Sequence, residues 1–138
     1  MGYLRGGDPV RASISLSSGS FQNFCDIRFD AASGGFGAIM DYCVIAKAGD
    51  DTQVRTAQRA LSAYNKLSAE AGGWSAVGVD EYQESEGSST LTVSFGVSFS
   101  PTNGVILTCN PTSSLTAPTI VLEYELRLFG DYTRVTPF

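Results

Sequence analysis

Acidic side chains offer the main catalytic chemistry that this sequence could support, because it contains no histidine. Without an imidazole there is no Ser-His or Cys-His nucleophile pair, and the commonest general base is missing. Paired carboxylates can act as general acid and base in glycoside hydrolysis. The densest acidic stretch, residues 80–89 (D-E-Y-Q-E-S-E-G-S-S), is polar and rich in turn formers, which is typical of a solvated loop. We therefore expect no enzyme activity, and a carboxylate-based hydrolase is the least favoured function.

Cysteine, lysine and glycine motifs add no clear chemistry. The cysteines Cys25, Cys43 and Cys109 are far apart and lie in apolar runs, so we predict small buried side chains and no zinc site. The two lysines, Lys47 and Lys66, stand in no motif for Schiff-base or phosphate chemistry. The glycine-rich residues 31–37 (A-A-S-G-G-F-G) lack the Lys-Ser/Thr of a phosphate-binding loop, and we predict a loop between strands there.

The charge balance argues against nucleic acid as a partner. The net charge is −5, and the basic residues form no cluster that would displace counterions from phosphates. The first eleven residues lack the apolar core of a signal peptide, and the chain has no apolar run of about 18 residues. We expect a soluble protein that is made inside the cell and does not enter a membrane.

The acidic pair Asp50 and Asp51 precedes the segment with the clearest helical spacing, residues 52–71. Apolar residues recur there at intervals of three and four, which predicts one apolar stripe along a helix: Val54, Ala57, Leu61, Tyr64, Leu67 and Ala71. Asp50 and Gln53 resemble a capping box, although Asp51 or Thr52 can be the cap instead. The natural end of this helix is the glycine pair at 72–73.

Alternation of apolar and polar residues predicts strands through most of the remaining chain. The clearest is residues 119–129 (T-I-V-L-E-Y-E-L-R-L-F), in which Glu123, Glu125 and Arg127 share the face opposite to the leucines. Residues 90–99 alternate in the same way, and 11–18, 21–29 and 105–109 supply further strands. Residues 38–46 are almost entirely apolar, which predicts a central strand covered on both faces.

These elements predict a mainly β fold. At 138 residues, we expect one domain over 1–138, with an extended arm over about 1–10. The order of elements favours an antiparallel β-sandwich or jelly roll of six to eight strands, with one inserted α-helix at about 52–71.

Two pairs of segments resemble strands in the shell domain of small icosahedral RNA-virus coat proteins of the tombusvirus and sobemovirus type. One pair is residues 104–109 (G-V-I-L-T-C) followed, after a Pro/Ser/Thr loop, by residues 119–129. The other is residues 24–29 (F-C-D-I-R-F) followed, after a turn, by residues 37–42 (G-A-I-M-D-Y). The chain departs from that family in lacking its Arg/Lys-rich amino-terminal arm, which argues against direct genome binding.

The resemblance implies a structural virion protein, a capsid or coat subunit that self-assembles into a large homo-oligomer. It also implies that acids just after the Asp-Tyr strand bind calcium between subunits, and Asp50 and Asp51 match those positions best. The helix-cap interpretation of these two acids stays open beside the calcium interpretation. Under the shell hypothesis, Glu123, Glu125 and Arg127 become candidates for contact between subunits, and the protein would be made in the host cytoplasm and located in the virion.

A second hypothesis is a surface module that binds a glycan or a protein on a similar sandwich. It predicts a monomer or small oligomer in which Trp74 or Tyr82 contacts the ligand.

Overall fold

The structure is a computed structural model that describes residues 9–29, 34–66, 69–76, 82–85, 90–100 and 104–138. The predicted arm over 1–10 therefore lies largely outside the described residues. The loop predicted over 80–89 is wrong at residues 82–85, which form a short strand that pairs with residues 53–56, and the rest of that stretch lies outside the described residues. All regular elements in the described part of the chain are strands: β1 (Val10–Leu16), β2 (Gln22–Phe29), β3 (Gly34–Ala48), β4 (Asp51–Lys66), β5 (Ala69–Ala76), β6 (Tyr82–Ser85), β7 (Leu91–Ser100), β8 (Gly104–Ser113), β9 (Thr119–Gly130) and β10 (Tyr132–Pro137).

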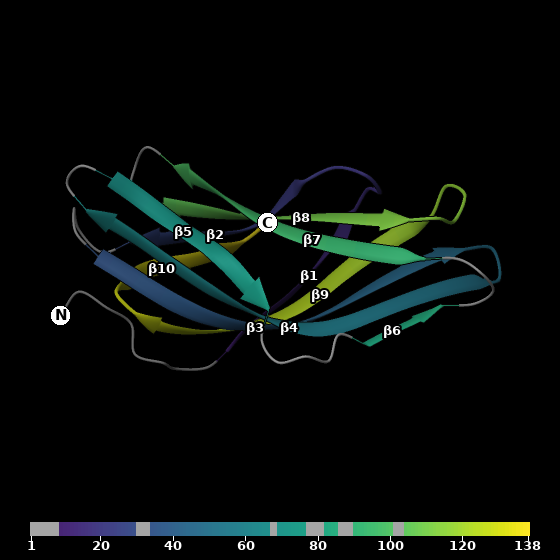
Figure 1. Cartoon of the computed structure of the whole chain (residues 1–138), viewed down its shortest axis with the longest axis horizontal. Helices are drawn as coiled ribbons and strands as arrows, with labels where there is room; N and C mark the ends of the chain where they lie inside the picture. The colour runs from purple at the N-terminus through teal and green to yellow at the C-terminus, as the bar shows by residue number, and fades with distance from the viewer. Residues whose placement is uncertain (1–8, 30–33, 67–68, 77–81, 86–89, 101–103) are drawn as a thin grey trace.

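The strands form two antiparallel sheets, which confirms the prediction of a mainly β fold. Sheet A has the order β1-β9-β3-β4-β5, with β6 pairing with β4, and sheet B has the order β10-β2-β8-β7. Figure 1 shows both sheets with their strands running roughly along the long axis of the molecule. Strands far apart in the sequence are neighbours, since β9 lies between β1 and β3 and pairs with both.

The helix predicted over 52–71 is wrong. Residues 51–66 form β4, which pairs with β3 from Ala48↔Asp51 to Gly34↔Asn65, and the segment continues into β5. The apolar residues with helical spacing divide between two faces, because Val54 and Tyr64 point away from the core while Leu61 is buried. Long-range pairing with β3 therefore overrides the local helix preference of this Ala- and Gln-rich segment.

The structure also corrects the capping assignment and the environment of residues 38–46. No helix begins at Asp50 or Asp51. Gly49 and Asp50 form a two-residue turn between β3 and β4, and Asp51 is the first residue of β4. Gly49 in that turn has a φ of 61°, a left-handed conformation that glycine adopts without strain. Strand β3 is central, but only one of its faces is covered, because Ile39, Cys43 and Ile45 are half-exposed.

A cluster of four aromatic rings joins the two sheets at the centre of the core. Phe24 packs edge-on against Tyr124, with 5.0 Å between ring centroids, and Phe95 packs in the same way against Tyr42, at 4.8 Å. Phe24 and Phe95 are 5.9 Å apart. The phenol of Tyr124 also donates a hydrogen bond of 3.0 Å to the backbone carbonyl of Phe24. Sheet A contributes both tyrosines and sheet B both phenylalanines, so the cluster fixes how the sheets stack.

A buried polar contact joins the two sheets near the turn between β3 and β4. Gln53 of β4 is fully buried, and its amide nitrogen donates a hydrogen bond of 3.0 Å to Ser114 Oγ. Ser113 Oγ donates a bond of 2.6 Å to the amide oxygen of Gln53. Because both polar ends of Gln53 are satisfied, this residue can replace an apolar side chain on the inner face of β4.

Replacing Tyr124 with Phe removes the hydroxyl from the aromatic cluster and leaves the ring. We expect the free energy of unfolding to fall by about 0.5–1.5 kcal/mol, because one hydrogen bond between the sheets is lost while the Phe24 carbonyl keeps the bond of 3.1 Å from the Phe138 backbone N–H. Urea denaturation followed by tryptophan fluorescence measures the change. Tyr64→Phe is the control. Because Tyr64 is 47% exposed, a group that loses contact with its hydroxyl can bind water instead. Equal effects of the two substitutions would contradict this role of Tyr124.

Candidate interaction surface

The outer face of sheet A brings together side chains from four strands in three rows that cross the sheet. Each row follows from the strand register, because paired residues point to the same side of an antiparallel sheet. We name them the charged row (Arg11, Glu125, Asp41 and Gln58), the small row (Ser13, Glu123, Cys43 and Thr56) and the apolar row (Val121, Ile45 and Val54).

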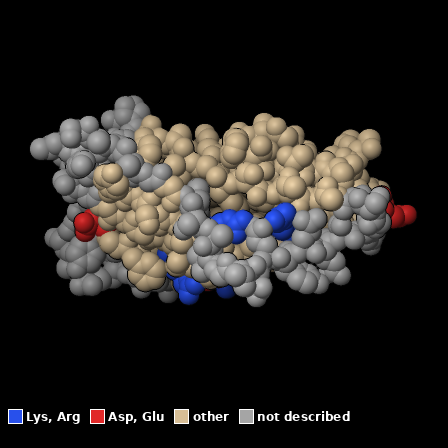
Figure 2. Space-filling model, in the orientation of Figure 1, with Lys and Arg blue, Asp and Glu red and all other residues tan. Residues whose placement is uncertain are grey.

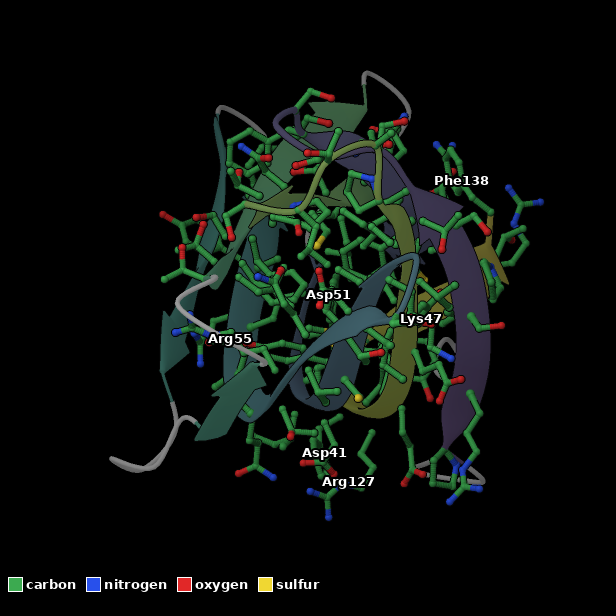
Figure 3. The ribbon with its side chains drawn as sticks, turned by 90° about the vertical axis from the view of Figure 1, so that its right-hand side faces the viewer. Asp41, Lys47, Asp51, Arg55, Arg127 and Phe138 are labelled. Carbon is green, nitrogen blue, oxygen red and sulfur yellow. The ribbon has the colours of Figure 1, made fainter. Side chains whose placement is uncertain are left out.

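The charged row is held by contacts between neighbouring strands. Arg11 Nε lies 2.6 Å from Glu125 Oε2, and the amide of Gln58 donates a hydrogen bond of 2.8 Å to Asp41 Oδ1. Arg127, one row further along β9, lies 3.9 Å from Asp41. Figure 3 shows the Asp41 and Arg127 side chains close together and pointing away from the ribbon. Glu125 and Asp41 are direct cross-strand neighbours, and a basic side chain lies beside each of them, Arg11 beside Glu125 and Arg127 beside Asp41.

A shallow hollow of about 530 Å³ lies between the charged row and the small row. Its floor is the backbone around Ala12, Tyr124 and Tyr42, whose side chains point into the core or against it. Small side chains at Ser13, Cys43 and Thr56 leave this space open. Glu123 stands in the small row, so one wall of the hollow carries an additional carboxylate.

Cys43 lines this hollow and carries its most nucleophilic type of side chain. Its environment, however, makes the thiol a weak nucleophile. Burial raises the pKa of the Cys43 thiol, and the nearby carboxylate of Glu123 raises it further. Burial also raises the pKa of Cys25 and Cys109 to about 12, so these thiols stay protonated in the folded core. The raised pKa values suit unreactive thiols rather than nucleophilic catalysis.

Apolar side chains beyond the hollow are left half-exposed on the same face. Ile45, Val54 and Val121 lie side by side on β3, β4 and β9. Ile39 and Ala60 pair further along β3 and β4, and Phe129 near the end of β9 is 57% exposed. The outer face therefore combines paired charges with apolar side chains, which is typical of the interfaces of interacting proteins.

The outer face of sheet B differs in composition from the outer face of sheet A. Figure 2 shows few charged side chains over β7 and β8, and the exposed residues of β7 are Thr92, Ser94 and Ser98. The predicted alternation in residues 90–99 is confirmed there, since Leu91 and Val93 are buried.

The predicted site residues fall into two separate places. Glu123, Glu125 and Arg127 lie on the outer face of sheet A, as their alternation predicted. Asp50 and Asp51 lie at the exposed turn between β3 and β4 and join no larger ligand set, because the described residues include no group of three or more His, Cys, Asp or Glu able to hold a metal. The Trp74 and Tyr82 side chains lie outside the described part of the structure.

The sequence interpretation missed Ile45 and Val54 as surface residues. The first was assigned to a strand covered on both faces and the second to a helix. Their shared row depends on the pairing Ile45↔Val54, and local sequence carries no signal for that pairing.

Comparison with protein-family models, with curated proteins and with solved structures found no match. In the described residues, no helix is long and apolar enough to cross a membrane.

Replacing Glu123 with Gln should make the Cys43 thiol react faster with a disulfide reagent at pH 8. Loss of the carboxylate removes one of the two causes that raise the pKa of Cys43, so more thiolate is present. Glu125→Gln is the matched control, since Glu125 pairs with Asp41 rather than with Cys43. Stopped-flow labelling measures both rates. Equal rates for the two variants would place Glu123 away from the thiol.

Proposed function

We propose that this protein is a structural subunit of a viral or virus-like shell that works by binding copies of itself. The observation that carries the self-association is the outer face of sheet A, where half-exposed Ile45, Val54 and Val121 share one surface with the charged row, from which the small row separates them. The assignment to a shell rests on the resemblance of the C-terminal strands to viral coat proteins. In this proposal the partners are identical chains and the location is the virion.

The charged row supports a specific contact better than a purely solvated face. Surface ion pairs contribute little to stability, typically about 0–1 kcal/mol, but opposite charges fix the register between partners. Arg11, Glu125, Asp41 and Arg127 present both signs within one small area. An identical face can complement this pattern when it is rotated, because the pattern contains both cationic donors and anionic acceptors.

Combined replacement of Glu123, Glu125 and Arg127 by Ser should preserve the fold and weaken assembly by roughly tenfold or more, because three side chains at the contact lose their charge-assisted bonds. Light scattering measures the associated mass, and electron microscopy reports whether particles form. The double variant Asp131→Ser, Arg134→Ser is the control, because both residues are exposed but lie off the outer face of sheet A. Unchanged assembly of the triple variant would mean that β9 serves only the core.

Calcium is a secondary part of the proposal. Calcium takes about six to eight oxygen ligands, so the adjacent carboxylates of Asp50 and Asp51 provide only part of a site, and a second copy would have to supply the rest. We expect a chelator to lower the assembled fraction, and the double variant Asp50→Asn, Asp51→Asn to abolish that response. Sedimentation with and without chelator measures it. Indifference of the wild-type protein to the chelator would refute calcium binding at this turn.

The hollow on sheet A favours a second candidate function, a module that binds a glycan or a protein. Its wall offers Ser13 and Thr56 hydroxyls beside the Glu123 carboxylate, groups that can bind sugar hydroxyls. This function predicts a monomer that gives a signal on a glycan array. A silent array together with particle formation would leave the shell subunit as the better account.

A further inference from the structure

Strand β1 forms an open edge of sheet A. It pairs with β9 on one side, and no described strand pairs with its other side. The opposite end of sheet A is different, because β5 lies against β7 of sheet B, whereas β1 has no comparable contact with a strand of sheet B in the described residues. The backbone groups along β1 are therefore available to another strand.

Strand β10, an edge strand of sheet B, carries features that discourage pairing. Its register with β2 shifts between Tyr132 and Arg134, and Pro137 lacks a backbone N–H. Strand β1 (V-R-A-S-I-S-L) has neither a bulge in its register with β9 nor a proline. Its single charged residue, Arg11, is directed to Glu125 on the outer face. Natural sheets usually protect an exposed edge, so an unprotected edge indicates a partner.

The sequence of β1 is complementary to itself in the antiparallel direction. When two copies pair about Ser13, Val10 faces Leu16 of the second copy, and Ala12 faces its Ile14. Each larger side chain thus meets a smaller one on the inner face, while Arg11 faces Ser15 on the outer face. No like charges oppose each other, and every side chain keeps its original face of the sheet.

Burial along β1 is consistent with a missing neighbour. Leu16 is buried, but Val10, Ala12 and Ile14 on the same inner face are only partly covered. A second copy that continues the sheet would place its own Leu16, Ile14 and Ala12 beside these three residues. Apolar surface left open in one chain would then be covered in the pair.

We propose that two copies of this chain join through β1, edge to edge and centred on Ser13, so that sheet A continues from one copy into the other. The inference deepens the proposed function and rests on its premise of self-association. It names a contact different from the outer face of sheet A, which stays available for further copies. A dimer built on β1 is thus the unit from which a larger assembly grows.

Disulfide trapping tests the register. In a Cys43→Ser background, Ser13→Cys should give a covalent dimer under mild oxidation, because residues opposite each other in an antiparallel pair have Cα atoms about 4.5–5.5 Å apart. Ser15→Cys is the matched control. Two copies of Ser15 would lie about 14 Å apart along the strands, which is too far for a disulfide. Non-reducing electrophoresis measures both. Equal cross-linking of the two variants, or none by Ser13→Cys, overturns the proposed pairing.

Charge at Ser15 tests the same pairing without a covalent bond. Ser15→Lys places a positive charge opposite the second copy's Arg11 twice in each dimer, which should weaken association roughly tenfold. Ser15→Glu should strengthen it. Within one chain, Lys at position 15 is favoured over Glu, because Glu123 lies diagonal to position 15 on β9. A difference in folding stability therefore cannot make the Glu variant the tighter dimer. The opposite order of dimer affinities in sedimentation equilibrium would overturn the proposal.

The outcomes separate this inference from the proposed function. Particles that form without a Ser13→Cys cross-link would refute the β1 contact and leave the shell proposal standing. A cross-linked dimer that never forms particles would support the β1 contact and refute the shell. A wild-type chain that stays monomeric at every concentration would refute both.

Discussion

The contact between the Tyr124 hydroxyl and the Phe24 carbonyl is the interaction on which the rest of this structure depends. It joins the centre of sheet A to the centre of sheet B within a cluster of four aromatic rings. Because burial raises the pKa of Tyr124, its phenol stays protonated and keeps donating. The side chains on the inner face of β9 are thereby held in the core. Its outer residues, Glu123, Glu125 and Arg127, are then directed away from the core, onto a face that also carries Asp41 and Cys43.

The burial of the inner face explains why the two faces of sheet A have different roles. The inner face is packed by Met40, Leu122 and their neighbours, whereas the outer face carries both half-exposed Ile45 and Val121 and the charged row. Sheet B shows a simpler outer surface of threonines and serines on β7. A protein that works through contacts with other molecules can therefore use sheet A for them, at its outer face and at the edge formed by β1.

Period-two alternation in residues 90–99 and 119–129 predicted β7 and β9 correctly, because each of these strands buries one face. The same logic failed for β4, where Gln53 and Arg55 occupy the inner face and Val54 the outer one. Gln53 is stabilised by residues some sixty positions away, Ser113 at the end of β8 and Ser114 just after it. Local sequence contains no trace of such partners. The charged residues of the candidate surface were predictable from β9 alone, whereas its apolar row was not, since it exists only when β3, β4 and β9 are in register.

Sedimentation velocity of the wild-type chain over a wide concentration range measures self-association through sheet A. We expect a monomer that gives way to a dimer and then to larger species as concentration rises. A single monomeric species at all concentrations, in buffers of different pH and salt, would contradict it.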